Sequence, residues 1–192
     1  EIYERWAARR HMEPAEMEKN RDVLRMAAML HDVGKVAISD LILKKPARFS
    51  EEEYEIMKSH TWLGARLFAE PQSEFDEVAA AVALTHHENW DGSGYPGMID
   101  PQTGLVLEKD SKGRPASRAG SDIPLYGRIV ALADVYDALS CRRVYKEAWD
   151  EDDVLKEIAE LSGTKFDPEL VEVFFEGLDA MRNIMARYPD AH

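Results

Sequence analysis

Apolar residues recur at helical spacing along most of this 192-residue chain. In the segment 14–31, which opens with a proline, they fall at i, i+3, i+4 and i+7, the spacing of one face of a helix. Ser50 and Glu53 form a capping-box pattern that predicts the start of a second helix. The segments 74–87 and 129–136 continue the helical pattern, so helices dominate the sequence.

Other signals mark where helices begin and where they are interrupted. Asp150 and Asp167 have the character of N-caps of the last two helices, and Pro168 follows at the first helical position. Strand signals are weak, although residues 105–107 could form one arm of a small hairpin. The segment 92–122 is rich in Gly, Pro, Ser and Asp and exceeds the ~12–15 residues of ordinary loops. We predict an all-α helical bundle with one long loop insertion.

Composition and charge narrow the class of protein. Hydrophobic residues make up 45% of the chain, enough for the core of a single domain, which we place over residues 1–192. The net charge of −13 repels long polyanions, so we expect no nucleic acid polymer as a partner. A small anionic ligand remains compatible with this charge, because a pocket that holds cations reverses the field locally.

The sequence also bears on the cellular compartment. No apolar run approaches the ~20 residues that a membrane span needs, and charged residues are spread through the first ten positions, unlike a signal peptide. The single cysteine, Cys141, has no partner for an intrachain disulfide, which favours a reducing compartment. We therefore expect a cytoplasmic protein without membrane insertion.

Six side chains of metal-binding type stand out among the helical segments: His31, Asp32, His60, His86, His87 and Asp134. They include four of the six histidines, and we assign the other two, His11 and His192, to a helix end and to the C-terminus. Asp134 lies in the apolar run 129–139, where a bare carboxylate would be costly to bury. A metal ion would remove that cost, and so would a buried ion pair with an arginine such as Arg128.

The types of ligand indicate which ions such a site would bind. Imidazoles and carboxylates without a thiolate suit divalent Fe, Mn, Ni or Co better than a structural zinc site. Six ligands exceed what one tetrahedral ion requires, so we expect two ions roughly 3.5–4 Å apart that share a carboxylate, an arrangement suited to phosphate ester hydrolysis. Fe or Mn is the preferred pair, with Ni, Co and Zn as alternatives.

Five strings of residues carry a resemblance to a known family. They are His-Asp-Val-Gly-Lys at 31–35, Lys-Ser-His at 58–60, the string 86–96 that ends in Gly-Tyr-Pro, Ala-Leu-Ala-Asp-Val-Tyr-Asp-Ala-Leu at 131–139, and Gly-Thr-Lys-Phe-Asp-Pro at 163–168. The chain resembles the HD-GYP phosphodiesterases, a branch of the HD phosphohydrolase superfamily that degrades cyclic di-GMP in bacteria. The resemblance runs from about residue 20 to about residue 175.

The resemblance implies a role for each matching ligand. Asp32 would bridge two metal ions. The remaining ligands would be His31 and Asp134 for the first ion, and His60, His86 and His87 for the second.

The resemblance also implies catalytic and substrate-binding residues. Asp32 and Lys35 would be catalytic, with Lys35 beside the scissile phosphate. Gly94, Tyr95 and Pro96 are similar to a loop that shapes the pocket and is linked to the binding of a signalling protein. Two further basic residues match a pair that contacts phosphate or guanine, although a solvated basic face is an equal alternative: Arg143 and Lys146.

The sequence departs from the family pattern before His31 and beside Arg143. The family has an earlier histidine in a His-x-x-Arg-Val string, which does not occur here, so we expect a chain truncated at its N-terminus inside the first family helix. A third metal ion would draw on that helix, and an upstream sensory or receiver domain would precede it. Val144 stands where the family usually has proline.

Residues 97–122 form an insertion between the Gly-Tyr-Pro string and the helix of Asp134. It carries four basic residues: Lys109, Lys112, Arg114 and Arg118. The insertion could act as a lid over a dianionic ligand, or it could be a surface insertion that the fold tolerates.

The reaction that these features predict is hydrolysis of a cyclic dinucleotide in second-messenger signalling. Cyclic di-GMP would open to a linear dinucleotide, and a second cleavage would give GMP. Two alternatives stay open: an HD hydrolase that acts on another nucleotide, and a catalytically weak sensor or docking module. The intact ligand set favours an enzyme, whereas the missing upstream histidine keeps the docking module open.

Overall fold

The architecture is all-α, as the sequence predicts. The structure, a computed structural model, describes residues 1–140 and 149–187, and over these residues it has no strand longer than an isolated bridge. With η marking a 3₁₀ helix, the elements are α1 (Ile2–Arg9), α2 (Pro14–Ala28), η1 (Val33–Ala37), α3 (Asp40–Leu43), α4 (Glu51–Lys58), α5 (His60–Arg66), α6 (Glu74–Thr85), η2 (Gly120–Asp122), α7 (Leu125–Ser140), α8 (Glu151–Glu160), α9 (Pro168–Glu176) and α10 (Leu178–Arg187).

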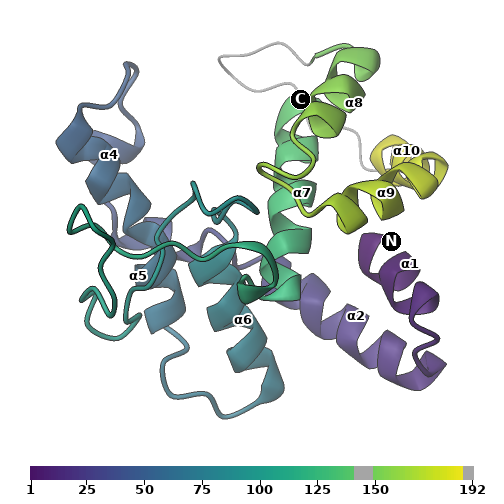
Figure 1. Cartoon of the computed structure of the whole chain (residues 1–192), viewed down its shortest axis with the longest axis horizontal. Coiled ribbons are helices and arrows are strands. Elements are labelled where there is room, and N and C mark those ends of the chain that lie inside the picture. Colours follow the sequence, from purple (N-terminus) through teal and green to yellow (C-terminus); the bar gives the residue numbers. More distant parts are fainter. Residues whose placement is uncertain (141–148, 188–192) are drawn as a thin grey trace.

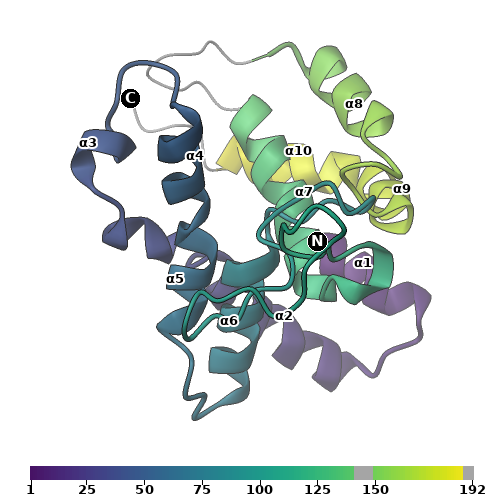
Figure 2. The ribbon, with the colours of Figure 1, turned by 60° about the vertical axis from the view of Figure 1, so that its left-hand side comes forward.

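Two helices organise the bundle. Helix α6 packs against α2, α5 and α7, and α7 also contacts α8 and α9. In Figures 1 and 2, α7 therefore lies between a half made of α4, α5 and α6 and a half made of α8, α9 and α10. Helix α1 packs against α2 and α9, so the first helix of the chain contacts the half that contains the C-terminal helices.

One main core holds the two halves together. It contains apolar side chains from α1, α2, α6, α7, α8 and α9, among them Ala27, Val82, Leu132, Ile158 and Phe174. All five are fully buried, and burial of a large apolar side chain contributes ~1.5–3 kcal/mol. The core thereby fixes the C-terminal ends of α2 and α6, which the candidate ligands follow, and the middle of α7, which carries Asp134.

Several predicted helix starts are confirmed. At α4, the Ser50 side chain accepts from Glu53 N–H and the Glu53 carboxylate accepts from Ser50 N–H, which completes the capping box. At α9, Asp167 accepts from Glu169 N–H and Pro168 occupies the first turn. Asp150 precedes α8 but makes no capping hydrogen bond with its side chain.

Two helix boundaries differ from the prediction. Helix α2 ends at Ala28, three residues before His31, because the next N–H groups bond three residues back: Leu30 to Ala27 (3.0 Å) and His31 to Ala28 (3.3 Å). This tighter turn leads the chain out of α2 and into η1. The helix that Asp167 caps is also not the last, since α10 follows it directly after Gly177.

The insertion 97–122 is irregular up to η2. Single antiparallel bridges join Ile99 to Val106 and Lys109 to Pro115, so the arm predicted at 105–107 is present as one bridge only. Gly104 lies against the ring of Trp62 on α5, where a Cβ atom would come within 2.9 Å of the indole. The insertion thus covers part of α5.

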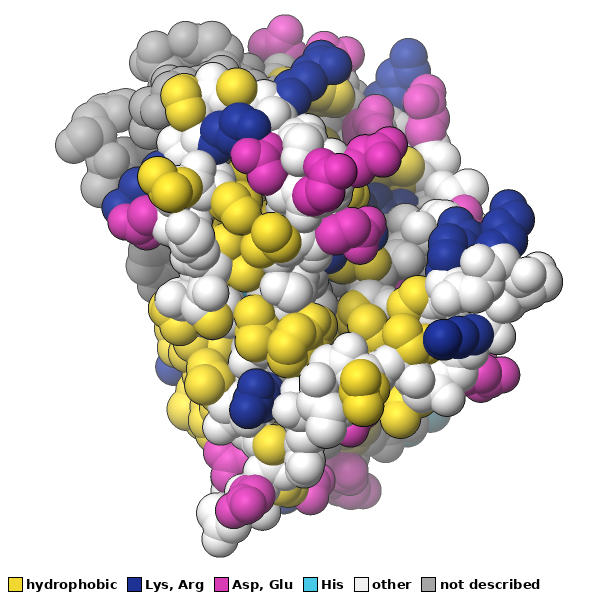
Figure 3. Space-filling view, turned by 90° about the vertical axis from the view of Figure 1, so that its left-hand side faces the viewer, with side chains coloured by type: hydrophobic (Ala, Val, Ile, Leu, Met, Phe, Trp, Pro, Cys, Tyr) yellow, Lys and Arg dark blue, Asp and Glu magenta, His cyan; other side chains and the backbone are white. Residues whose placement is uncertain are grey.

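Apolar side chains gather on the face of the molecule that carries α4, as Figure 3 shows. Exposed large hydrophobic residues on α3 and α4 include Leu41, Leu43, Tyr54 and Ile56. Among the helices that the structure describes, none has both the length and the hydrophobicity to span a membrane.

Candidate metal centre

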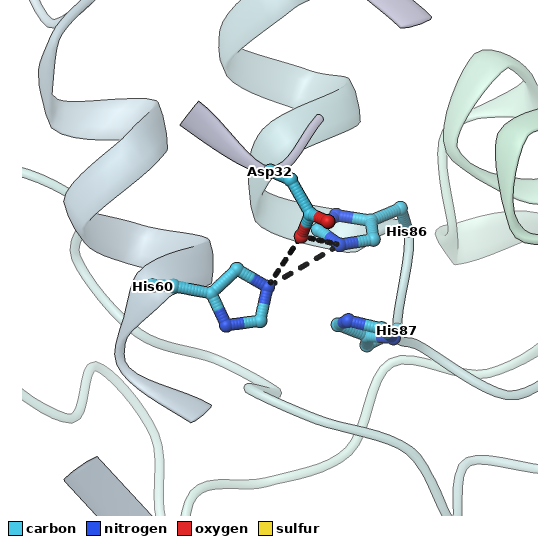
Figure 4. A group of neighbouring side chains, drawn as sticks. All are labelled: Asp32, His60, His86 and His87. Carbon is cyan, nitrogen blue, oxygen red and sulfur yellow. Dashed lines mark hydrogen bonds and ion pairs between the residues drawn. The ribbon is translucent and has the colours of Figure 1, made fainter. Parts of the chain in front are cut away.

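All six predicted ligand side chains come together at one place in the fold. His31 and Asp32 lie in the turn between α2 and η1, His60 begins α5, His86 and His87 follow α6, and Asp134 lies on α7. Figure 4 shows four of them, with the Asp32 carboxylate and the imidazoles of His60, His86 and His87 directed toward a common centre. Residues up to 103 positions apart thus meet (from His31 to Asp134).

A close contact between backbones brings Asp32 to His60. Gly34 in η1 crosses α5 so closely that a Cβ atom on it would lie 1.9 Å from the His60 carbonyl oxygen and 2.4 Å from the Gly64 nitrogen. Only a glycine fits at this crossing. The Gly in the string 31–35 therefore serves to seat the Asp32 carboxylate beside the first residue of α5.

The two oxygens of Asp32 face two groups of ligands. Oδ1 lies 3.4 Å from His60 Nε2 and 3.8 Å from His86 Nε2, and these two nitrogens are 3.4 Å apart. With one atom from His87 included, the ligand atoms of this group all lie within 4.8 Å of one another. Oδ2 lies 3.4 Å from His31 Nε2, which in turn lies 3.7 Å from Asp134 Oδ1.

Backbone carbonyl groups orient three of the imidazoles. The contacts of Nδ1 are His31 to Ala28 O (2.6 Å), His60 to Met57 O (2.7 Å) and His86 to Ala83 O (3.0 Å). Because a carbonyl oxygen only accepts, each Nδ1 carries the proton and donates it, which leaves the Nε2 lone pair toward the centre. This is the arrangement by which proteins prepare histidines to bind a metal.

The lowered pKa values of His60, His86 and His87 agree with that arrangement. Burial and the neighbouring imidazoles lower the pKa of His86 to about 3 and the pKa of His87 to about 2, so both rings are neutral near pH 7. Burial also lowers the pKa of His60. A hydrogen bond to Asp32 raises the pKa of His31. Burial raises the pKa of the Asp32 carboxyl, but hydrogen bonds from His31 and Lys35 outweigh it and bring that pKa below its usual range.

One buried oxygen gives a direct test of whether a metal ion suits this site. Oδ1 of Asp32 is buried and has no hydrogen-bond partner within the described part of the chain. A buried carboxylate oxygen without a partner is costly, and a cation between Asp32, His60 and His86 would satisfy it. The donor set therefore fits a divalent metal ion.

The burial expected for Asp134 was wrong. Its side chain is 31% exposed, so it is not a deeply buried carboxylate. The suggested alternative partner, Arg128, instead forms an ion pair with Asp167 at the start of α9. Asp134 nevertheless reaches the centre through His31.

The positions of the other predicted residues vary. Lys35 Nζ donates to Asp32 Oδ2 at 2.6 Å. His11 is exposed in the turn after α1, in keeping with its assignment to a helix end. Arg143 and Lys146 lie outside the described residues, as do Val144 and His192.

The segment Gly94, Tyr95 and Pro96 borders the centre. Tyr95 stacks on the His87 ring, with centroids 4.8 Å apart and planes at 29°, and its N–H donates to His87 O at 3.2 Å. The three residues also line a cavity of about 520 Å³, together with Lys58 and Trp62. Tyr95 thus contacts both this cavity and the imidazole cluster.

The reasoning from sequence missed residues that hold the loop after His87. Glu88 is buried and accepts from Gly97 N–H at 2.7 Å, and burial raises its pKa to about 7. Two carbonyls of the string 163–168 accept from the same loop: Thr164 O from Asp91 N–H and Lys165 O from Trp90 N–H. The available signal was that all of these residues except Gly97 belong to the strings 86–96 and 163–168, which carry the family resemblance.

Comparison with known proteins identifies a family and several relatives of this chain. The HD domain family model matches residues 2–139. The chain is 39% identical over 173 residues to the 3'3'-cGAMP-specific phosphodiesterase 2 of Vibrio cholerae. The matched region makes up 90% of this chain and 30% of that protein. It is 40% identical over 174 residues to the cyclic di-GMP phosphodiesterase response regulator RpfG of Xanthomonas campestris pv. campestris. The matched region makes up 91% of this chain and 41% of that protein.

A solved structure supports the fold. The crystal structure of a cyclic GMP-AMP specific phosphodiesterase of Vibrio cholerae, V-cGAP3, superposes with a TM-score of 0.55 at 21% identity, covering 96% of this chain and 44% of that one. The chain thus spans less than half the length of each of these three proteins. Because the family model covers well over half of its residues, the chain belongs to the HD domain family.

Proposed function

We propose that this chain is a metal-dependent phosphodiesterase that hydrolyses a cyclic dinucleotide. The observation that carries the proposal is the convergence of His31, His60 and His86, through their Nε2 atoms, on the two oxygens of Asp32. Three nitrogen lone pairs and one carboxylate meet there, with the imidazole protons held on the opposite side of each ring. Two divalent metal ions bound there would lower the pKa of a bound water molecule and neutralise charge on the phosphate oxygens.

The proposed ligands divide between two ions that share Asp32. They are His31 and Asp134 for one ion, and His60, His86 and His87 for the other. The lack of a thiolate favours Fe or Mn, with Ni, Co and Zn as weaker candidates. The ligands on the described residues suffice for two ions, and a third would draw on the family helix that carries the earlier histidine.

Two further residues of this chain would act on the substrate. Lys35, whose ammonium group lies at the edge of the centre beside Asp32, would stabilise charge on the scissile phosphate or on the departing ribose oxygen. Tyr95 would form one wall of the site, because its ring stacks on His87. Arg143 and Lys146 stay predicted contacts to phosphate or guanine.

The relatives support a cyclic dinucleotide as the substrate class. Two relatives of nearly equal identity are named for different molecules, 3'3'-cGAMP and cyclic di-GMP. The cyclic phosphodiester is therefore better supported than either pair of bases, and hydrolysis would give a linear dinucleotide and then mononucleotides. A panel of both cyclic dinucleotides and of noncyclic nucleotides separates this proposal from an HD hydrolase with another substrate.

Loss of a shared ligand tests the proposal directly. Asp32→Ala and His86→Ala should each lower hydrolysis of cyclic di-GMP at least about 100-fold, since even residues that only support metal ligands often contribute 10–100-fold. The assay is chromatography of the products from anaerobically purified protein with Mn²⁺ or Fe²⁺. Asp40→Ala, at an exposed carboxylate paired with Lys44, is the control that should keep its activity. Wild-type rates in the two ligand variants, with helical content retained, would refute the proposal.

The surroundings of the site support a role in signalling. Tyr95 contacts Tyr54 of α4, whose neighbouring apolar side chains are exposed. Exposed apolar patches often mark protein interaction surfaces, so we propose that a signalling protein contacts the segment Gly94, Tyr95 and Pro96. We also propose a cytoplasmic location and an upstream sensory or receiver domain, in keeping with the greater length of the relatives.

A further inference from the structure

The side chains of Glu88 and Arg118 both form hydrogen bonds with the backbone of Gly97. The Glu88 carboxylate accepts from Gly97 N–H at 2.7 Å, and Arg118 Nε donates to the Gly97 carbonyl oxygen at 3.4 Å. Arg118 Nε also lies 4.0 Å from Glu88 Oε1. The Glu88 side chain is 0% exposed and that of Arg118 is 20% exposed, so the contact lies inside the protein.

These contacts connect the insertion to the imidazole cluster. Glu88 follows His87 directly, and Gly97 follows Pro96, so their hydrogen bond closes the loop that carries Tyr95. Gly94 lies so close to the backbone of residues 87–89 that a Cβ atom on it would be 2.3–2.6 Å away. The loop therefore packs against the backbone of His87 and of the two residues that follow it.

The insertion completes the enclosure of Gly97. This residue has φ = +76°, and a Cβ atom on it would lie 2.5 Å from the Ala116 carbonyl oxygen. Met98 N–H donates to the same oxygen at 2.8 Å. Arg118 thus reaches Glu88 from a segment that is already packed on Gly97.

His87 differs from the other three imidazoles of the cluster in what orients its ring. The rings of His31, His60 and His86 are each fixed by a carbonyl hydrogen bond to Nδ1. Among residues 1–140 and 149–187, the ring nitrogens of His87 have no hydrogen-bond partner. Its ring instead stacks on Tyr95 and touches the His60 and His86 rings.

We propose that Glu88 and Arg118 are positioning residues for the metal centre. By holding Gly97 they fix the Tyr95 ring, and the Tyr95 ring orients His87 in place of the missing carbonyl hydrogen bond. This inference rests on the proposed metal centre and assigns the insertion 97–122 a part in it. The residues act through His87 and touch neither ion nor substrate.

The test is binding of Mn²⁺ alone, measured by calorimetry on metal-stripped protein. His87→Ala identifies the binding step to which His87 contributes. Arg118→Met and Tyr95→Leu should weaken that same step about 10-fold, as loss of residues that support metal ligands commonly does. Tyr95→Phe, which keeps the stacking ring, should bind as the wild type does.

A matched control lies in the same insertion. Arg114→Met removes an arginine that pairs with Asp110 and is 69% exposed, so its Mn²⁺ affinity should stay at the wild-type value. Glu88→Gln keeps an acceptor for Gly97 N–H and should lose less affinity than Arg118→Met. Arg118→Lys provides a second variant should Arg118→Met unfold, and it should also weaken the step, because an ammonium group does not reproduce the Nε contact.

The outcomes separate this inference from the proposed function. If the wild type binds no Mn²⁺, the metal centre itself is refuted. If the wild type binds Mn²⁺ and folded Arg118 and Tyr95→Leu variants bind it equally well, the positioning role is refuted and the centre stands. A loss in Arg114→Met as large as in Arg118→Met would likewise overturn the inference, because it would reflect charge alone.

Discussion

Lys35 and Asp32 form the charged edge of the centre, where the two residues are joined by a 2.6 Å contact. Replacement of Lys35 by glutamine keeps a hydrogen-bond donor and removes the charge. We expect Lys35→Gln to lower kcat about 100-fold, the scale of a single electrostatic or acid–base contribution, with unchanged metal content. Steady-state kinetics on cyclic di-GMP and metal analysis measure the two quantities.

The matched variant is Lys44→Gln, at an exposed lysine that pairs with Asp40. It should keep the wild-type kcat. If Lys35→Gln also keeps it and binds metal more tightly, Lys35 serves only as a counter-ion for Asp32, and its catalytic assignment is wrong.

Residue chemistry predicted which side chains converge better than it predicted the surroundings of those side chains. His and Asp in helical strings suffice to nominate a metal centre, and all six nominated side chains converge. The burial expected for Asp134 did not follow, since an apolar run does not reveal which of its side chains remains partly exposed. The contact between Glu88 and Arg118 was missed because it depends on the path of the loop through Gly97, which no periodicity encodes.

The crossing of η1 and α5 makes a prediction for whole elements. In Gly34→Ala, the new methyl group would meet backbone atoms at 1.9–2.4 Å, so η1 must move away from α5 and take Asp32 with it. We expect a loss of about 3 kcal/mol or more in the free energy of unfolding, at the upper end of overpacking effects, together with loss of bound metal. Chemical denaturation and metal analysis measure these effects.

Gly64 provides the comparison on the other side of the same crossing. In Gly64→Ala, the nearest atoms would lie at 3.2–3.3 Å, which a small shift can accommodate. This variant should lose less stability than Gly34→Ala and should retain metal. Equal losses in the two variants would show that the crossing does not set the position of Asp32.

Helix starts were easier to predict than helix ends. A start such as that of α4 is set by a local exchange of hydrogen bonds between Ser50 and Glu53, so the sequence signal is sufficient. The end of α2 at Ala28 is set by the approach of Gly34 to α5, which involves residues about thirty positions away. The helical spacing continues to His31, so the helix predicted from it extends past the true end at Ala28.

The pH dependence of stability belongs to the whole molecule. In the folded chain without metal, the pKa values of His86 and His87 lie at about 3 and about 2, below the ordinary value of 6.5. Below pH 6.5 the unfolded chain therefore binds protons that the folded chain does not, and acidification favours unfolding. Each imidazole contributes at most ~1.4 kcal/mol per pH unit, and the lowered pKa of His60 adds to the effect. His31 and Glu88, whose pKa values are raised, offset part of it.

We therefore expect the free energy of unfolding of metal-stripped protein to fall as the pH is lowered from 6.5 to 5, as measured by urea denaturation at several pH values. The net charge of −13 acts in the opposite sense, because protonation relieves repulsion among acidic groups. That relief is small in this range, since most carboxyl groups titrate near pH 4. A variant with both His86→Ala and His87→Ala should lose most of the slope. If it keeps the wild-type slope, the acid sensitivity arises elsewhere, and the cluster does not hold these two imidazoles neutral.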